Sequence, residues 1–290
     1  MKLIRFGKDG EENPGIVVDD VYYDVSSLGE DYDENFFGTD GLKRLEEFLK
    51  KNKNSLPKVE TNVRLGSPVS RPSKIVCIGL NYADHAKETN AAIPTEPVIF
   101  LKATSSLCGP FDEIIIPKNS EKTDWEVELA VVIGKKTSYV DEADAMNYVA
   151  GYCLHNDVSE RNFQLERNGT WDKGKGCDTF APLGPWLVTK DEIQDVNDLH
   201  LWLTVNGKTM QNGTTSNLIF KIPFLVSYVS QFMSLLPGDI ISTGTPAGVG
   251  LGMKPNVYLR DGDVVELGID GLGKAKQNVK AYRAKPASNE

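Results

Sequence analysis

From residue 75 onward this chain consists of short apolar runs interrupted by glycine and proline, and that pattern limits the fold more than any other feature. Only residues 141–149 and 221–236 show helical spacing. Apolar runs of about four to eight residues between turn signals are typical of strands. Asn206-Gly207, placed between two alternating runs, is a strong hairpin signal. The sequence therefore predicts a strand-rich α+β fold.

The predicted helix at residues 221–236 is amphipathic. Its apolar side chains recur at helical spacing and form one stripe, which consists of Ile222, Leu225, Val226, Val229 and Phe232. A stripe of this kind is expected to pack against the core. Pro237-Gly238 is expected to end the helix.

The first seventy residues are richer in polar side chains than the rest of the chain and form a separate sequence pattern. Short strands and an amphipathic helix at residues 41–53 are predicted there. Residues 67–74, SPVSRPSK, hold two prolines and three serines, which favours a boundary. A chain of 290 residues is long enough for one large and one small domain. We therefore predict a small α/β accessory domain over residues 1–70 and a main domain over residues 71–290.

The balance of charge is acidic. The chain has 32 Lys and Arg against 41 Asp and Glu, a net charge of -9. This charge argues against nonspecific binding to the phosphate backbone of nucleic acid, so no nucleic-acid partner is expected. Small anionic substrates remain compatible with it, because a local group such as Lys173 and Lys175 can override the global charge.

The four cysteines are widely spaced, without a C-x-x-C pair, so neither a zinc–thiolate site nor a disulfide framework is predicted. The first residues lack the apolar run of a signal peptide. No stretch approaches the about 20 apolar residues of a membrane span. We expect a reduced, cytoplasmic protein with no membrane partner.

The run TDWEVELAVVIGKK, residues 123–136, places two carboxylates in an otherwise apolar strand. Strand side chains alternate between faces, so Glu126 and Glu128 share one face. Two like charges side by side raise each other's pKa, and burial adds to this, so a positive partner is expected. On this run alone, a solvated face with Lys122 or Lys135 nearby fits the pattern as well as a cation site does.

Asp157 follows a predicted strand, at a turn into a helix. Asp157-x-x-Glu160 has the form of a capping box, so a helix cap is one interpretation. The other is a third oxygen ligand beside Glu126 and Glu128. Three carboxylates with no competing Cys or His cluster would select a hard divalent cation such as Mg²⁺ or Mn²⁺.

Other segments carry candidate catalytic or substrate-binding side chains. His85 and Glu88 share a face if their segment is helical, so Glu88 could orient His85 for general acid/base work. Lys175, among glycines, could present an ammonium to a substrate carboxylate or a developing oxyanion. Lys102 is a similar candidate. Each is equally compatible with an ordinary loop or surface position, and the other two histidines are interpreted as ordinary residues.

Seven ordered motifs resemble the fumarylacetoacetate hydrolase family. They are IGLNYADHAKE, PVIFLKATSSLCGP, the Glu-Val-Glu strand, NDVSERNFQ, GKGCDTFAPLGPW, VNGKTMQNG and ISTGTPAGVG. The resemblance covers residues 74 to about 282, and the first seventy residues resemble the smaller variable domain of the family's longer members. It implies a catalytic domain of mixed, rolled β-sheets that forms a homodimer.

The resemblance also implies roles for single residues. Glu126, Glu128 and Asp157 match the family's ligands for Mg²⁺ or Mn²⁺. The segment with His85 and Glu88 resembles a lid whose dyad activates water.

Further positions resemble the family's substrate site. Lys175 matches its active-site lysine. Arg161 and Gln164 match polar positions near the site, and Thr245 matches a turn residue at the substrate carboxylate. Together with Lys102, these residues are the predicted contacts of a small 2-oxo acid.

The activity that the resemblance implies is cleavage of a C–C bond in a 2,4-diketo acid, giving pyruvate and a carboxylic acid. The substrate would be an acylpyruvate or a 2,4-diketo-3-deoxy sugar acid, because residues 172–189 look most like the subgroup with sugar acid hydrolases and ureidoglycolate lyase-like proteins. Ureidoglycolate lyase, oxaloacetate-type decarboxylase and 2-oxo acid isomerase are the alternatives within the family. A noncatalytic small-acid binding protein is the alternative from another class.

Overall fold

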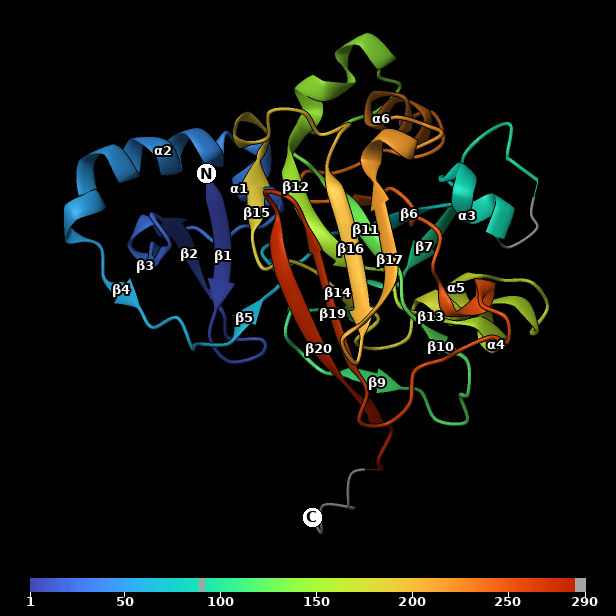
Figure 1. The fold of residues 1–290 in the computed structure, drawn as a ribbon. Helices are drawn as coiled ribbons and strands as arrows, with labels where there is room; N and C mark the ends of the chain where they lie inside the picture. Colours follow the sequence, from blue (N-terminus) through green and yellow to red (C-terminus); the bar gives the residue numbers. More distant parts are fainter. Residues whose placement is uncertain (89–91, 285–290) are drawn as a thin grey trace, which may run out of the picture.

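The computed structural model describes residues 1–88 and 92–284 and confirms the predicted α+β class. An 11-stranded sheet and a five-stranded sheet form the body of the described chain, and helices lie around them (Figure 1). Two smaller sheets pair β10 (Thr123–Asp124) with β13 (Ser159–Glu160), and β8 (Leu107–Cys108) with β14 (Ala181–Pro182).

The large sheet joins the N-terminal strands to the rest of the chain. Its spatial order is β4 (Lys58–Val59), β3 (Val21–Asp24), β2 (Asn13–Val18), β1 (Lys2–Phe6), β15 (Leu187–Thr189), β12 (Val149–Asn156), β11 (Val127–Ile133), β18 (Ile240–Ser242), β6 (Ile75–Gly79) and β7 (Val98–Lys102), with β5 (Leu65–Gly66) beside β1. Lys2 of β1 pairs with Val188 of β15. One sheet therefore continues across the boundary predicted at residue 70.

The five-stranded sheet contains the predicted hairpin. Its order is β17 (Lys208–Thr214), β16 (His200–Val205), β19 (Val264–Ile269), β20 (Gly273–Ala281) and β9 (Ile114–Ile116). Asn206 and Gly207 connect β16 and β17 with φ angles of 51° and 76°. Positive φ at both central residues is what a tight two-residue hairpin turn requires, so the hairpin prediction is confirmed.

Strand β11 separates two hydrophobic cores. Val127, Leu129 and Val131 pack in the core that includes the five-stranded sheet, while Ala130 and Val132 pack in the core below the N-terminal helices. This alternation follows from the period of two in a strand. Even-numbered residues at the start of β11 consequently point to the second face.

The helices are α1 (Glu34–Gly38), α2 (Gly41–Asn52), α3 (Ala83–Glu88), α4 (Arg161–Leu165), α5 (Asp172–Lys175) and α6 (Ile222–Ser230). The 3-10 helices are η1 (Ser26–Leu28), η2 (Lys53–Ser55), η3 (Thr104–Ser106), η4 (Glu142–Tyr148), η5 (Lys190–Glu192), η6 (Thr215–Asn217) and η7 (Gly250–Gly252). The helix predicted at residues 41–53 is confirmed as α2, which lies alongside the N-terminal strands at the left of Figure 1.

Two helix predictions need correction. The helix predicted at residues 221–236 ends at Ser230, because Leu235 forms a β-bridge with Thr137 and so cannot stay helical. Phe232 is 62% exposed and therefore not part of the buried stripe. The pattern at residues 141–149 becomes the 3-10 helix η4 instead of an α-helix.

Asn81, fully buried between β6 and α3, connects three parts of the chain. Its side-chain amide donates to the backbone oxygens of Thr243 (2.8 Å) and Phe220 (3.1 Å), and its oxygen accepts from the Phe220 N–H (2.7 Å). The segment that leads into α3 is thereby tied to the ends of β18 and α6.

We expect Asn81→Ala to lower the free energy of unfolding by about 2–4 kcal/mol. The substitution leaves the backbone groups of Thr243 and Phe220 without these hydrogen bonds at a position largely shielded from water. Chemical denaturation of this variant measures the loss. Asn35→Ala, at an exposed position of α1, is the control and should change stability by less than about 0.5 kcal/mol. Equal stabilities of the two variants would contradict the anchoring role.

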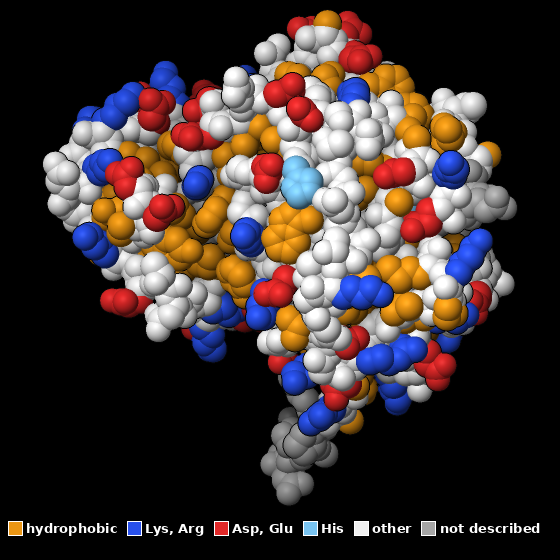
Figure 2. All heavy atoms as spheres, in the orientation of Figure 1, with side chains coloured by type: hydrophobic (Ala, Val, Ile, Leu, Met, Phe, Trp, Pro, Cys, Tyr) orange, Lys and Arg blue, Asp and Glu red, His pale blue; other side chains and the backbone are white. Residues whose placement is uncertain are grey.

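On the face in Figure 2, Lys and Arg side chains alternate with Asp and Glu, and hydrophobic side chains gather over the N-terminal strands. A small cluster of buried hydrophobic residues lies among the same strands and consists of Ile4, Phe6, Val17 and Leu65. In the described part of the chain, the helices are all too short or too polar to cross a membrane.

Candidate active site

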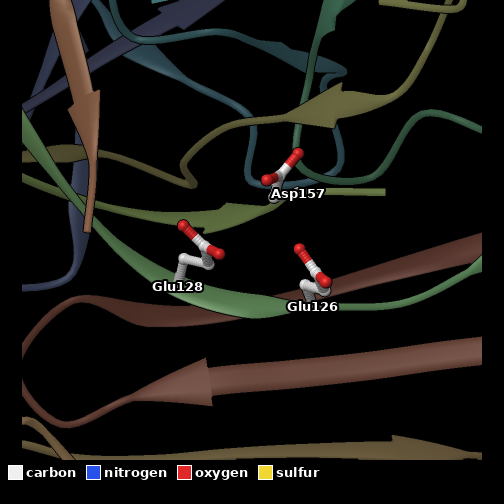
Figure 3. Close-up of side chains that lie close together, drawn as sticks. All are labelled: Glu126, Glu128 and Asp157. Carbon is white, nitrogen blue, oxygen red and sulfur yellow. The ribbon is translucent and has the colours of Figure 1, made fainter. Parts of the chain in front are cut away.

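Three carboxylates converge where β11 begins and β12 ends. Glu126 and Glu128 point to one side of β11, and Asp157 reaches the same space from the adjacent antiparallel strand (Figure 3). One oxygen of each lies within 4.8 Å of the others. All three are buried, with Asp157 fully inaccessible. Burial rules out the solvated strand face that the sequence had left open.

Asp157 does not cap the following helix. The N-cap of α4 is Glu160, whose carboxylate accepts the N–H of Asn162. The carboxylate of Asp157 instead receives two ammonium groups, from Lys102 at 2.6 Å and from Lys175 at 2.7 Å. Burial raises the pKa of Asp157, but these two cations outweigh it and hold the pKa well below its usual value. Asp157 is therefore a carboxylate directed into the cluster.

The positive partners of Glu126 come from α4 and α5. Lys175 Nζ lies 2.6 Å from Glu126 Oε2, and an Arg161 guanidinium nitrogen lies 2.7 Å from Glu126 Oε1. Burial raises the pKa of Glu126, yet Lys175 and Arg161 lower it overall. Lys122, which the sequence offered as a partner, binds Glu166 at the surface instead.

Glu128 differs from the other two carboxylates. It accepts hydrogen bonds from the Ser242 hydroxyl (2.5 Å) and the Gly244 N–H (2.9 Å). Burial, with Asp157 and Glu126 nearby, raises its pKa well above the usual range. Burial and the two neighbouring carboxylates thus disfavour a negative charge on Glu128.

The donor set fits a divalent cation. Three carboxylate oxygens within reach of one another are the hard ligands that Mg²⁺ and Mn²⁺ prefer. The two hydrogen bonds that Glu128 accepts come from uncharged groups, a hydroxyl and a backbone N–H, so further positive charge would be accommodated beside this carboxylate. Glu126, Glu128 and Asp157 are therefore the residues that would hold the ion.

His155 lies behind Glu128. Its Nδ1 is 2.7 Å from the Ser242 oxygen, and that oxygen in turn lies 2.5 Å from Glu128 Oε2. Burial lowers the pKa of His155 to about 3, so the ring is neutral. The ordinary, noncatalytic interpretation of this histidine agrees with a supporting position behind Ser242.

Helix α3 brings His85 and Glu88 together, as the spacing predicted. His85 Nδ1 lies 3.6 Å from Glu88 Oε2, and both Glu88 oxygens lie 3.0 Å from the Gly248 amide nitrogen. Burial raises the pKa of Glu88, whereas His85 and the backbone N–H groups lower it to a net value below normal. A Cβ on Gly252 would come 2.3 Å from the Glu88 carboxyl carbon, so glycine permits this approach.

A cavity of about 240 Å³ is lined by several of these groups, but not by Glu88 or Asp157. Its lining comprises Ile78, Gly79, Leu80, His85, Phe100, Glu126, Glu128, Arg161, Gln164, Leu165, Trp171, Lys175, Thr245 and Leu251. Of the substrate contacts predicted from the sequence, Lys102 lies outside this lining, fully buried behind Asp157. Thr245 is fixed in it by its hydrogen bonds to Val127 O (2.9 Å) and Gln211 (2.7 Å).

Asp124 is an important residue that the sequence analysis missed. Its carboxylate accepts Arg161 Nε at 2.9 Å and the N–H groups of Gly250 (2.7 Å) and Leu251 (2.9 Å). It thereby positions both Arg161 and the η7 loop at the cavity. The sequence does contain a signal for Asp124: it lies two residues before Glu126, so Asp124, Glu126 and Glu128 form an i, i+2, i+4 series of carboxylates that would share one face of a strand.

The family model described as the C-terminal part of fumarylacetoacetate (FAA) hydrolase matches residues 74–280. The chain belongs to the fumarylacetoacetate hydrolase family. The match contains every site residue discussed above, and the predicted family is confirmed.

The relatives of this fumarylacetoacetate hydrolase family enzyme include hydrolases and isomerases. A presumed hydrolase of Burkholderia multivorans is 53% identical over 285 residues, covering 98% of this chain and 100% of the relative. The maleylpyruvate hydrolase of Sphingobium sp. SYK-6, solved with manganese(II) and pyruvate, is 30% identical with a TM-score of 0.82. The match covers 98% of this chain and 100% of the hydrolase chain. The 5-carboxymethyl-2-hydroxymuconate delta-isomerase of Mycobacterium smegmatis is 33% identical with a TM-score of 0.77. The match covers 98% of this chain and 100% of the isomerase chain.

Proposed function

We propose that this enzyme hydrolyses a C–C bond of a 2,4-diketo acid, giving pyruvate and a carboxylic acid, with Mg²⁺ or Mn²⁺ held by Glu126, Glu128 and Asp157. The observation that carries the proposal is one cavity lined by these glutamates, the Lys175 ammonium and His85 of the His85–Glu88 pair. The likeness to a maleylpyruvate hydrolase that binds manganese(II) and pyruvate supports it. The cation would draw negative charge from the 2-oxo acid group as the bond breaks.

Lys175 is suited to stabilise charge and unsuited to remove a proton. Burial lowers its pKa, but Asp157 and Glu126 raise it well above the usual value, so the group stays an ammonium. Two of its three N–H groups can serve Glu126 and Asp157, at 2.6 and 2.7 Å. The third would donate to the oxygen that becomes negative when the distal carbonyl of the substrate is attacked.

The His85–Glu88 pair would supply the general base. His85 Nδ1 faces Glu88, and Nε2 would accept a proton from water as that water adds to the C4 carbonyl. The C3–C4 bond then breaks, and its electron pair passes into the 2-oxo acid half as the enolate of pyruvate. His85 would return the proton to C3, so that pyruvate and the carboxylic acid balance substrate plus water.

The test is pyruvate release from a panel of acylpyruvates and 2,4-diketo-3-deoxy sugar acids in Mg²⁺, in Mn²⁺ and in excess chelator. Oxaloacetate, assayed for pyruvate, and ureidoglycolate, assayed for glyoxylate, are the controls. Metal-dependent pyruvate with the matching carboxylic acid is the expected result. If no diketo acid is cleaved, the hydrolase proposal is wrong, and activity on a control alone would assign the enzyme to lyase or decarboxylase chemistry.

His85→Asn should separate water activation from the other reactions of a 2-oxo acid. Loss of a general base is expected to lower the rate of diketo acid hydrolysis by about 10²–10⁴. Any metal-dependent oxaloacetate decarboxylation would persist, because that reaction consumes no activated water. Both rates are measured under saturating Mg²⁺, with the exposed His200→Asn as control. Unchanged hydrolysis in His85→Asn would remove the dyad from the mechanism.

A further inference from the structure

We infer that the tail of the substrate, beyond its C4 carbonyl, ends in an uncharged, apolar group. This inference rests on the proposed function and extends it to the substrate class. Its basis is a division of the cavity lining into a buried polar part and a partly exposed apolar part.

The polar and apolar lining residues differ in their exposure. Every lining residue with an ionisable, amide or hydroxyl side chain is at most 7% exposed, and these are His85, Glu126, Glu128, Arg161, Gln164, Lys175 and Thr245. The lining residues that are partly exposed are Gly79, Leu80, Leu165, Trp171 and Leu251. The 2-oxo acid end of the substrate would lie against the first group, so its far end would lie against the second, which we call the apolar rim.

Two short helices produce this division. On α4, Arg161 and Gln164 are buried, whereas Leu165 at its end is 44% exposed. At α5, Trp171 and Lys175 are four residues apart and therefore share a face. Helix geometry thus fixes the positions of the residues that would bind the reacting end relative to those that would enclose the tail.

Trp171 is held firmly in the apolar rim. Its ring lies 5.3 Å from that of Phe100 at a tilted angle of 59°. It also packs on Gly79, where an added Cβ would come 2.6 Å from Trp171 Cζ3. The backbone at Gly79 leaves room for an indole, which provides a broad apolar wall for the tail.

Among the residues that the structure describes, the rim offers no cation to a charged tail. The two cationic side chains in the described lining, Arg161 and Lys175, already bind carboxylates of the protein. Lys254 belongs to an adjoining hollow that shares only Leu251 with this cavity. A distal carboxylate would therefore lose water without gaining a partner, which is costly.

The small volume of the cavity indicates that the tail is also short. Its volume of about 240 Å³ lies below the roughly 300–1,000 Å³ of sites for drug-sized ligands. Each methylene of a tail that fits against the rim should raise kcat/KM about fourfold, which corresponds to about 0.8 kcal/mol of apolar burial.

Matched substrates test the inference. We compare kcat/KM in Mg²⁺ for 2,4-dioxooctanoate, its 8-hydroxy derivative and 2,4-dioxooctanedioate, which differ only at the last carbon. The acid with the methyl end should exceed the dioate by at least about tenfold and also exceed the hydroxy acid. A preference for the dioate or the hydroxy acid would overturn the inference. If Lys254→Met then removed a dioate preference, the adjoining hollow would be the tail site.

Leu165→Arg provides a gain of function, because it places a cation on the apolar rim. We expect the preference for 2,4-dioxooctanoate over the dioate to shrink about tenfold in this variant. Phe111→Arg is the matched control, since Phe111 is 47% exposed and absent from the lining. An equal shift in both variants would mean that overall charge, not the rim, decides the preference, and would contradict the inference.

Binding of acids that cannot be cleaved separates this inference from the proposed function. 2-Oxooctanoate and 2-oxooctanedioate lack the C4 carbonyl, and their affinities in Mn²⁺ are measured by calorimetry. Tighter binding of 2-oxooctanoate, with no diketo acid cleaved, would refute the hydrolase and keep the apolar tail. Cleavage with tighter binding of the dioate would refute the tail alone, and no binding of either acid would refute both.

Discussion

Glu126→Ala should abolish both turnover and the binding of Mg²⁺ or Mn²⁺ while the chain remains folded. Glu126 contributes one of the three carboxylates of the cluster, and two carboxylates with Lys102 and Lys175 beside them have too little negative charge to hold a divalent ion. Calorimetric titration with Mn²⁺ and the pyruvate-release assay measure the two losses.

The fold should survive this substitution because both cations of Glu126 keep a second partner. Arg161 still binds Asp124 at 2.9 Å, and Lys175 still binds Asp157 at 2.7 Å. The loss in free energy of unfolding should therefore stay below the value of about 3–5 kcal/mol that is typical when a buried charge loses its only partner.

Two further variants complete the design. Glu126→Gln keeps the side-chain volume and should lose metal binding in the same way, so it covers the case in which the alanine variant is unstable. Glu166→Ala, at an exposed carboxylate of the surface pair with Lys122, should leave metal binding unchanged. Activity of the natural protein in excess chelator, or metal binding retained by both Glu126 variants, would refute the metal role.

The parts of this site that the sequence predicts are those set by local geometry. The shared face of Glu126 and Glu128 follows from strand alternation alone, and the His85–Glu88 pair from one turn of helix. The Asn206-Gly207 hairpin is equally local. Each needs no knowledge of what lies across the molecule.

The missed parts depend on long-range contacts. Ser242, which donates to Glu128, lies 114 residues away along the chain, and Asp124 holds Arg161 from 37 residues away. No periodicity encodes such pairs. The early end of α6 has the same origin, since the bridge of Leu235 to Thr137 overrides local helical spacing.

The continuous large sheet is another long-range feature of the chain. The proline- and serine-rich residues 67–74 indicate a change of segment, but they do not show that β1 pairs with β15. Buried residues of the N-terminal segment, such as Leu3 and Phe36, share a core with Ile75 and Val132. Composition predicts where a segment changes, whereas strand pairing decides how far a core extends.

Lys175→Met should lower turnover by about 10²–10³ without weakening metal binding. The methionine keeps most of the apolar stem but removes the ammonium that would stabilise the developing oxyanion, a loss that typically costs about 2.7–4 kcal/mol of barrier. Metal affinity should hold or rise, because the Lys175 ammonium occupies oxygens of Glu126 and Asp157 that a divalent cation would also use.

Turnover measured at saturating Mg²⁺, together with Mn²⁺ titration, separates this role from that of Glu126. Lys173→Met, on an exposed part of the same helix, is the matched control and should retain full activity. Normal turnover in Lys175→Met would exclude the ammonium from the mechanism. A parallel loss of turnover and metal affinity would instead make Lys175 a residue that organises the carboxylates, because a group acting only on the oxyanion leaves the affinity for the ion intact.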